Sequence, residues 1–368
     1  MTTQEDILVK RSTALVGLVA VGALSLSACG SDNNSSKSST SKIACASGDL
    51  KGAGSTFQKN IVAEWIKDYQ DACTKAQLDY QGIGSGAGIK QFGEGTIDFA
   101  GSDSTMKPDE QTAADAKCGS PALHLPVTAG GIAVAYNLPS VKDLQLSPKT
   151  LAGIFQGTIT KWDDAAIKAD NPSATLPSTA ITAVHREDSS GTTKVFSSFL
   201  KATAAMDWKL GADKELTWPA SVQGAKGSDG VTQAVAGAEG GITYVEKSFV
   251  DNSTTLAAAK VQNSAGTYAE LASGSVSEAL ANATTDAKDG DIKVTIDPTK
   301  ITGDAYPITA VSYEIVCSKG KDAGKAALLK SFLTYAIGAG QDQAEANGYA
   351  PLPTALADQV KASVAALS

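Results

Sequence analysis

One stretch of the chain, from His185 to Thr193, combines a rare cation with the start of a helix. Arg186 is one of two arginines among 368 residues, and the other, Arg11, lies in a predicted leader. Lysine serves almost everywhere else, which indicates that this position needs a planar, permanently charged guanidinium. Ser190-Gly191-Thr192 follows, and apolar residues then recur at helical spacing. Free N–H groups and hydroxyls beside an arginine favour an oxyanion site, although a structural arginine next to a capped helix fits these residues equally well.

Polar loops of the same kind follow other predicted strands. Ser55-Thr56 comes after a predicted strand over 50–54 and opens a helix, and Gly84-Ser85 follows a strand over 78–81. Asp103 follows a strand over 97–100. Repeated strand–loop–helix units predict an α/β architecture with mainly parallel sheets, in which ligands bind at the carboxyl ends of the strands. Because all these loops fall at such ends, their convergence favours the oxyanion site over the structural alternative.

The rest of the folded region gives fewer signals. A long strand is predicted over 122–136, and Gly130-Gly131 inside it suggests a hinge between two lobes. A strand over 181–185 precedes Arg186, and 224–230, rich in glycine, is predicted as a loop. A further strand is predicted over 306–317. The Ser/Ala/Thr-rich region 250–300 is expected to hold a helix over about 268–282 and surface loops.

Composition limits the possible classes of function. The 42% hydrophobic and 19% charged content is typical of a globular protein, and the length allows two compact domains. The net charge of −8 argues against nucleic acid as a partner and against wholesale binding to anionic membranes. No Cys-x-x-Cys or Cys/His cluster is present, and only His124 and His185 occur. We therefore expect no metal site and no cofactor.

The first 28 residues have the pattern of a lipoprotein signal peptide. Lys10 and Arg11 precede an apolar run over 14–26, which is too short for a comfortable transmembrane helix, and Leu26-Ser27-Ala28-Cys29 closes the run. Glu5 and Asp6 depart mildly from this pattern, and an ordinary signal peptide with a coincidental cysteine is the alternative. The interpretation predicts a lipidated Cys29 on the extracytoplasmic face of the cell membrane. Residues 29–44 would then be the lipidated cysteine and a flexible tether rich in Ser and Asn.

The folded region contains four further cysteines. An even number of cysteines in an exported chain predicts two disulfides. The sequence alone allows three pairings of Cys45, Cys73, Cys118 and Cys317.

A set of motifs in a fixed order carries a resemblance to a known family. There are four main motifs. Gly-Ala-Gly-Ser-Thr-Phe begins at Gly52, and Tyr-Gln-Gly-Ile-Gly-Ser-Gly-Ala-Gly begins at Tyr80. Asp-Phe-Ala-Gly-Ser-Asp begins at Asp98, and Arg-Glu-Asp-Ser-Ser-Gly-Thr begins at Arg186. Lys161-Trp162-Asp163-Asp164 and Ala350-Pro351-Leu352-Pro353 match the same family. Each motif is weak alone, but together the chain over 48–360 resembles the phosphate-binding receptor of the high-affinity phosphate ABC transporter.

The resemblance implies a class II periplasmic-binding-protein fold, in which two α/β lobes are joined by two crossing segments. Lobe I would comprise 45–131 plus 306–368, and lobe II would comprise 132–305. It also implies partners, namely inorganic phosphate and the membrane permease subunits of an ABC transporter. If the outgoing and returning crossing strands are antiparallel neighbours, the lobe arrangement implies the disulfides Cys45–Cys73 and Cys118–Cys317.

The resemblance also implies a set of phosphate-binding residues. Arg186 would be the bidentate cation, Asp188 the carboxylate that steadies it, and Asp103 the acceptor of the phosphate's own proton. The other expected contacts are hydrogen-bond donors, and they are Ser55, Thr56, Phe57, Ser85, Ser190, Gly191 and Thr192. This chain departs from the family pattern at Ser55, where relatives can have Ala, and at Ser189, where Gly is common.

Asp103 would set the choice between oxyanions. Phosphate keeps at least one proton at neutral pH, whereas fully ionised sulfate would present only lone pairs to a buried carboxylate. Mismatches of this kind can discriminate by ~10⁴ or more. A receptor for sulfate or another oxyanion is the second hypothesis, and Asp103 argues against it. A plain helix-capping role is the structural alternative for Asp103.

A secreted phosphatase or serine hydrolase is the third hypothesis. Ser190 near His185 and Asp188 resembles a triad, but the chain has no Gly-x-Ser-x-Gly elbow and no metal cluster. His185 belongs to a predicted strand, where a structural role is expected. We therefore predict no catalytic residue and a binding protein rather than an enzyme.

Overall fold

The structure, a computed structural model, describes residues 43–368. The predicted signal peptide, Cys29 and the predicted tether up to residue 42 lie outside the described residues. Among the helices of the described part, none has the length and apolar character that crossing a membrane requires.

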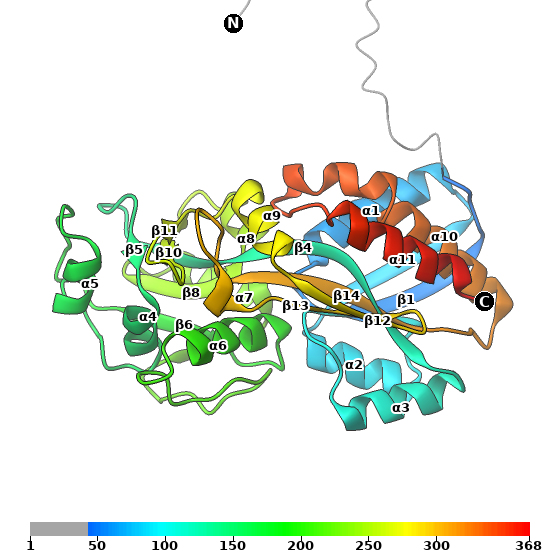
Figure 1. The fold of residues 1–368 in the computed structure, drawn as a ribbon, viewed down its shortest axis with the longest axis horizontal. Coiled ribbons are helices and arrows are strands. Elements are labelled where there is room, and N and C mark those ends of the chain that lie inside the picture. The colour runs from blue at the N-terminus through cyan, green and yellow to red at the C-terminus, as the bar shows by residue number, and fades with distance from the viewer. Residues whose placement is uncertain (1–42) are drawn as a thin grey trace, which may run out of the picture. The chain divides into compact units, whose positions relative to one another are not determined.

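Strands and helices alternate along most of the described chain (Figure 1). The strands are β1 (Gly48–Gly54), β2 (Ala76–Gly82), β3 (Phe99–Ser102), β4 (Ala122–Asn137), β5 (Gln145–Leu146), β6 (Thr182–Arg186), β7 (Gln223–Ala225), β8 (Gly241–Glu246), β9 (Ala257–Ala258), β10 (Lys260–Gln262), β11 (Tyr268–Ala269), β12 (Thr284–Lys288), β13 (Asp291–Thr295) and β14 (Thr309–Cys317). The helices are α1 (Lys59–Ala72), α2 (Ser85–Glu94), α3 (Pro108–Cys118), α4 (Pro148–Phe155), α5 (Ala165–Asp170), α6 (Gly191–Thr203), α7 (Gly227–Ala236), α8 (Lys247–Asp251), α9 (Ser273–Ala281), α10 (Ala323–Ala336) and α11 (Thr354–Ala366), with short 3-10 turns η2 (Pro298–Lys300), η3 (Ala339–Gln343) and η4 (Glu345–Asn347).

The main sheet has the strand order β2-β1-β3-β14-β4-β8-β6-β7, with β9 also paired to β4. We call β2, β1, β3, β14 and the first part of β4 the first half-sheet, and the rest of β4 with β8, β6 and β7 the second half-sheet. Figure 1 shows α1, α10 and α11 on one face of the first half-sheet and α2 and α3 on the other. The predicted α/β, two-lobe class II fold is confirmed. The crossing strands are antiparallel neighbours, as the expected disulfide pairing supposed, so the sheet is mixed rather than mainly parallel.

β4 is the strand that belongs to both half-sheets. Residues from Ala122 to Gly131 pair with β14, and residues from Ile132 to Asn137 pair with β8. All of β4 is buried and nearly all of it is apolar, as expected for a central strand covered on both faces. The change of partner falls directly after Gly130-Gly131. At Gly131 a side chain would meet Leu271 at 2.1 Å, so the absence of a Cβ lets a neighbouring segment pack against the strand at this point.

Some local predictions differ from the structure. α1 begins at Lys59 rather than at Ser55, because Thr56 to Gln58 form a bend before it, and the apolar face of the helix is buried. The expected loop over 224–230 is wrong, since β7 ends at Ala225 and α7 begins at Gly227. Glycine density suggested a loop, but here the glycines allow a tight strand-to-helix turn, with Gly227 at φ +69°.

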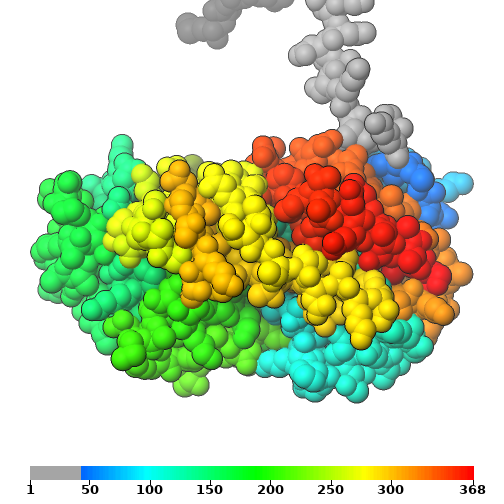
Figure 2. Space-filling view, in the orientation of Figure 1, coloured from blue at the N-terminus to red at the C-terminus, as the bar shows by residue number. Residues whose placement is uncertain are grey.

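The region 250–300 also differs from the prediction. The expected helix is shorter, Ser273–Ala281, and β12 and β13 form an antiparallel hairpin where surface loops were expected. Although this hairpin falls within 132–305, it packs on the first half-sheet, where Asp291 accepts hydrogen bonds from the His124 N–H and ring. Figure 2 shows this segment, in yellow to orange, on the surface beside the red α11. Its polar, alternating strands gave no sign of this position.

Two disulfides lie within the first half-sheet and its helices. They join Cys45 to Cys73 and Cys118 to Cys317, which is the pairing that the resemblance implied. The second bond links the end of α3 to the end of β14 across 199 residues of sequence. Each bond restricts the unfolded chain and stabilises the fold by about 2–4 kcal/mol.

Candidate functional site

The predicted binding residues lie at the carboxyl ends of strands from both half-sheets. Ser55 to Phe57 follow β1, Ser85 opens α2 after β2, and Asp103 follows β3. Arg186 ends β6, and Ser190 is the N-cap of α6, whose first residues are Gly191 and Thr192. All of these side chains are buried. The sheet topology thus places residues that are 130 positions apart in the sequence at one location.

Hydrogen bonds connect the two groups of residues directly. The Gly191 N–H donates to Ser85 Oγ at 3.1 Å, and Thr192 Oγ1 donates to Asp103 Oδ2 at 3.3 Å. A third contact joins Thr56 Oγ1 to Ser228 Oγ at 2.7 Å. The two half-sheets therefore meet at the site through polar groups that carry no net charge, apart from Asp103.

Arg186 is held by a bidentate contact with Asp188. Its Nε and Nη2 atoms donate to the two carboxylate oxygens at 2.7 and 2.6 Å, and the side chain is only 1% exposed. Burial lowers the pKa of Arg186, but the Asp188 carboxylate outweighs burial and leaves that pKa raised. Asp188 also accepts the Gly227 N–H at 2.9 Å. The guanidinium is thus permanently charged and fixed in orientation, with Nη1 left to face Ser228 at 3.4 Å.

Asp103 is a buried carboxylate surrounded by hydroxyls. Ser55 Oγ and Ser312 Oγ donate to Oδ1 at 2.5 and 2.7 Å, whereas Oδ2 accepts only the longer Thr192 contact. Burial raises the pKa of Asp103, although these hydroxyls and Arg186 partly offset the effect. The least occupied acceptor of this carboxylate is therefore Oδ2, on the side that faces the second half-sheet.

The remaining predicted donors are partly engaged within their own loops. The Phe57 N–H donates to Ser55 Oγ at 3.0 Å, and its buried ring lies edge-on to Tyr349. Ser190 Oγ accepts the Thr193 N–H at 3.2 Å, as an N-cap does. These contacts fix the loops, and the hydroxyl proton of Ser190 stays available for donation.

His185 lies beside the site but does not take part in a triad. Its ring stacks on Trp218 with centroids 4.8 Å apart, and Nδ1 contacts the Arg186 carbonyl oxygen at 2.9 Å. Burial lowers the pKa of His185. Among the described hydrogen bonds none joins His185 to Ser190. Its role is packing, as expected for a strand residue.

Three polar residues of the site were not predicted from the sequence, namely Ser228, Glu246 and Ser312. Ser228 Oγ donates to Glu246 Oε2 at 3.0 Å in addition to its contacts with Thr56 and Arg186. Ser312 Oγ contacts both Asp103 and Gln58. The sequence does contain a signal for Ser228. Gly-Ser-Asp-Gly precedes Val231 and Val235, which have helical spacing, and this pattern predicts that a helix begins near Ser228.

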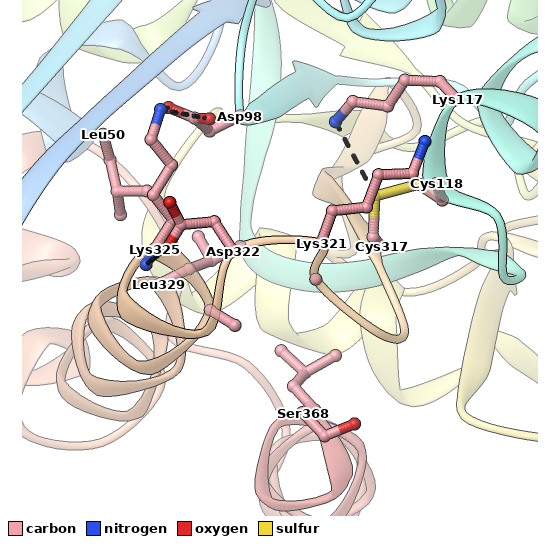
Figure 3. A pocket seen from close by; sticks show the side chains of 13 residues that line it. Leu50, Asp98, Lys117, Cys118, Cys317, Lys321, Asp322, Lys325, Leu329 and Ser368 are labelled. Carbon is pink, nitrogen blue, oxygen red and sulfur yellow. Dashed lines mark hydrogen bonds and ion pairs between the residues drawn. A yellow bond between two sulfur atoms is a disulfide. The ribbon is translucent and has the colours of Figure 1, made fainter.

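A separate small pocket lies at the edge of the first half-sheet, next to the Cys118–Cys317 disulfide (Figure 3). Two residues of its charged lining form an ion pair, with Lys325 contacting Asp98 at 2.9 Å. Lys117 Nζ points toward Cys317 Sγ at 3.7 Å. None of the predicted binding residues lines this pocket, so it does not belong to the candidate site. Over the described residues no cluster of His, Cys, Asp and Glu could hold a metal ion.

Known proteins resemble this chain over most of its length. The family model described as "PBP superfamily domain" matches residues 39–339. "Phosphate-binding protein PstS 3" of Mycobacterium tuberculosis is 39% identical, covering 97% of this chain and 99% of that protein. "Phosphate-binding protein PstS" of Xylella fastidiosa is 37% identical, covering 85% and 84% respectively.

Solved structures show the same fold. A high-affinity periplasmic phosphate-binding protein solved with phosphate matches with a TM-score of 0.70 and 24% identity, covering 86% of this chain and 93% of that one. A putative phosphate ABC transporter substrate-binding protein from Clostridium perfringens matches with a TM-score of 0.60 and 20% identity, covering 83% and 100%. From the family model and the curated relatives together, the chain belongs to the PstS family of the PBP superfamily.

Proposed function

We propose that this chain is an extracytoplasmic receptor that binds inorganic phosphate between two lobes and delivers it to an ABC permease for import. One observation carries the proposal: the fixed guanidinium of Arg186 and the buried acceptor carboxylate of Asp103 lie close enough to interact, with neutral hydrogen-bond donors around Asp103. Phosphate suits this arrangement because it has charge to satisfy Arg186 and a proton to donate to Asp103. The names of the relatives and the phosphate-bound neighbours support the same ligand.

In this proposal the phosphate-binding residues are those expected from the sequence. Ser55, Thr56, Phe57, Ser85 and Asp103 would contribute from lobe I, comprising 45–131 plus 306–368. Arg186, Ser190, Gly191 and Thr192 would contribute from lobe II, comprising 132–305, with Asp188 holding the arginine. The direct bonds between the two groups, such as Gly191 to Ser85, support lobes that close over the ligand.

Alternative functions fit less well. A buried Asp103 disfavours sulfate, which cannot donate a proton to it. The prediction that the chain is a binding protein and not an enzyme is confirmed by its family membership. The geometry of His185, stacked on Trp218, agrees with this conclusion.

We also propose that the receptor is tethered to the cell membrane by lipid on Cys29. Lys10, Arg11 and the apolar run before Leu26-Ser27-Ala28-Cys29 support this proposal. The tether would let the receptor reach permease subunits in the same membrane.

Lipid anchoring and delivery can be tested together in cells that lack their own copy of this receptor. The full-length chain should incorporate labelled palmitate, fractionate with membranes and restore phosphate uptake at low phosphate. The Cys29→Ala variant should incorporate no palmitate, because the acylated residue is gone, and should leave the membrane fraction. Ser27→Ala serves as a matched control. Palmitate incorporation by Cys29→Ala would contradict the anchoring proposal, and absence of uptake with the unaltered chain would contradict delivery.

A further inference from the structure

Glu246 is a buried carboxyl group that the proposed binding scheme does not use. It ends β8, is 1% exposed, and accepts a hydrogen bond from Ser228 Oγ at Oε2. Its Oε1 atom is buried and has no hydrogen-bond partner among the described residues. No ion pair of the described residues includes Glu246. An ionised carboxylate in such a place is costly, whereas the neutral acid is tolerated.

Ser228 links Glu246 to both sides of the phosphate site. Its hydroxyl lies 2.7 Å from Thr56 Oγ1 of the first half-sheet and 3.4 Å from Arg186 Nη1 of the second. A hydroxyl has one proton to donate, so the state of the Glu246 carboxyl decides what Ser228 can offer its other neighbours. An ionised Glu246 would also compete with an incoming anion for the charge of Arg186.

We propose that Glu246 takes up a proton when phosphate binds, and that its neutral form, acting through Ser228, positions Thr56 and Arg186 for the anion. This inference rests on the proposed function. It makes Glu246 a positioning residue and makes phosphate affinity depend on the protonation of the protein as well as of the ligand.

The groups around Glu246 determine the direction of the effect. Arg186 from β6 favours the ionised form, whereas Asp103 and the buried environment favour the neutral form, and Tyr349 is the other titratable group close enough to interact with it. The following residue, Lys247, is engaged with Asp251. Burial raises the pKa of Glu246 to about 8. A bound phosphate adds negative charge and closure excludes water, so the pKa of Glu246 is higher in the bound state than in the open one.

The sign of the pH dependence follows. Since binding raises this pKa, binding takes up a proton, and affinity falls as the pH rises through the interval between the open-state and bound-state pKa values. The fall attributable to Glu246 is at most about tenfold per pH unit, as for one proton. In the Glu246→Gln variant the side chain is neutral at every pH and can still accept from Ser228, so this contribution should vanish.

Titration calorimetry of the purified protein with inorganic phosphate tests the inference. The dissociation constant is measured for the unaltered protein, for Glu246→Gln and for the control Glu187→Gln, which changes an exposed glutamate next to Arg186. The pH values bracket the pKa of Glu246, which is about 8. Phosphate and Asp103 titrate in all three proteins, so the difference between curves isolates Glu246. We expect Glu246→Gln to lose less affinity with rising pH than the other two proteins.

Proton uptake by the unaltered protein provides a test that does not depend on the variant folding. Binding heats are measured near pH 8 in buffers of different ionisation enthalpy, which gives the number of protons taken up on binding. This number should exceed the uptake that phosphate and Asp103 account for. The reference for that uptake is Glu246→Gln or, if that variant does not fold, the unaltered protein well below the pKa of Glu246. Identical pH profiles for the unaltered protein and Glu246→Gln, or no proton uptake near pH 8, would overturn the inference. Failure of the unaltered protein to bind phosphate at any pH would instead overturn the proposed function.

Discussion

Replacing Arg186 by alanine should abolish most phosphate binding. The guanidinium is the one fixed cation among the predicted binding residues of the described chain, and it is almost wholly buried. Losing one partner of a buried, hydrogen-bonded charge pair costs about 2–5 kcal/mol, which corresponds to roughly 30-fold to several thousand-fold in the dissociation constant. Arg186→Lys should also bind weakly, because a lysine keeps the charge but cannot form the two-pronged contact.

The substitution has a second consequence that the experiment must separate. Asp188 would remain buried without its cation, which destabilises the fold. The double variant Arg186→Ala with Asp188→Ala removes both charges and should recover thermal stability while still failing to bind phosphate. His185→Ala is the matched control at the neighbouring position and should keep most of the affinity. Near-normal phosphate binding by a folded Arg186→Ala protein would show that the oxyanion site is elsewhere.

Asp103→Asn should reduce the preference for phosphate over sulfate by at least about 100-fold, since a buried hydrogen-bond mismatch can discriminate by ~10⁴ or more. The amide retains an acceptor oxygen for Ser55 and Ser312, so the loop should keep its shape. At the position of Oδ2 the asparagine presents an N–H donor, which repels the proton of phosphate and can donate to the lone pairs of sulfate. Phosphate affinity should fall and sulfate binding should appear.

The measurement is a pair of titrations, phosphate and sulfate, on the same protein preparation. Asp109→Asn, the same change at an exposed position on α3, should leave both affinities unchanged. If Asp103→Asn binds phosphate and sulfate in the original ratio, Asp103 does not select the ligand and its role is to cap and support the loop.

The strands and the arginine site were accessible from the sequence because local patterns encode them. β1, β2, β3 and β6 each end in a polar loop, and a rare arginine followed by Ser-Gly-Thr marks a helix start. The direction of each strand and its carboxyl end follow from the chain alone. For β1, β2 and β3 the shared position of these ends follows from their parallel pairing. β6 belongs to the second half-sheet, and its meeting with them depends on the antiparallel crossing strands.

The contacts between the two half-sheets could not be predicted from local sequence patterns. Glu246 precedes Lys247 at a strand end and has the appearance of an ordinary surface glutamate, and only the sheet order β4-β8-β6 brings it to Arg186. Ser228 lay in a stretch whose glycines suggested a loop. The hairpin β12–β13 was missed for a related reason, since the position of β13 depends on contacts with His124 and with α11, which lie far away in the sequence.

The most direct test of the phosphate-receptor account is a calorimetric titration of the purified protein with inorganic phosphate and, separately, with sulfate at neutral pH. We predict a saturable heat with phosphate at a stoichiometry of one per chain and no heat with sulfate under the same conditions. Equal binding of the two anions, or no binding of phosphate by a folded protein, would contradict the account.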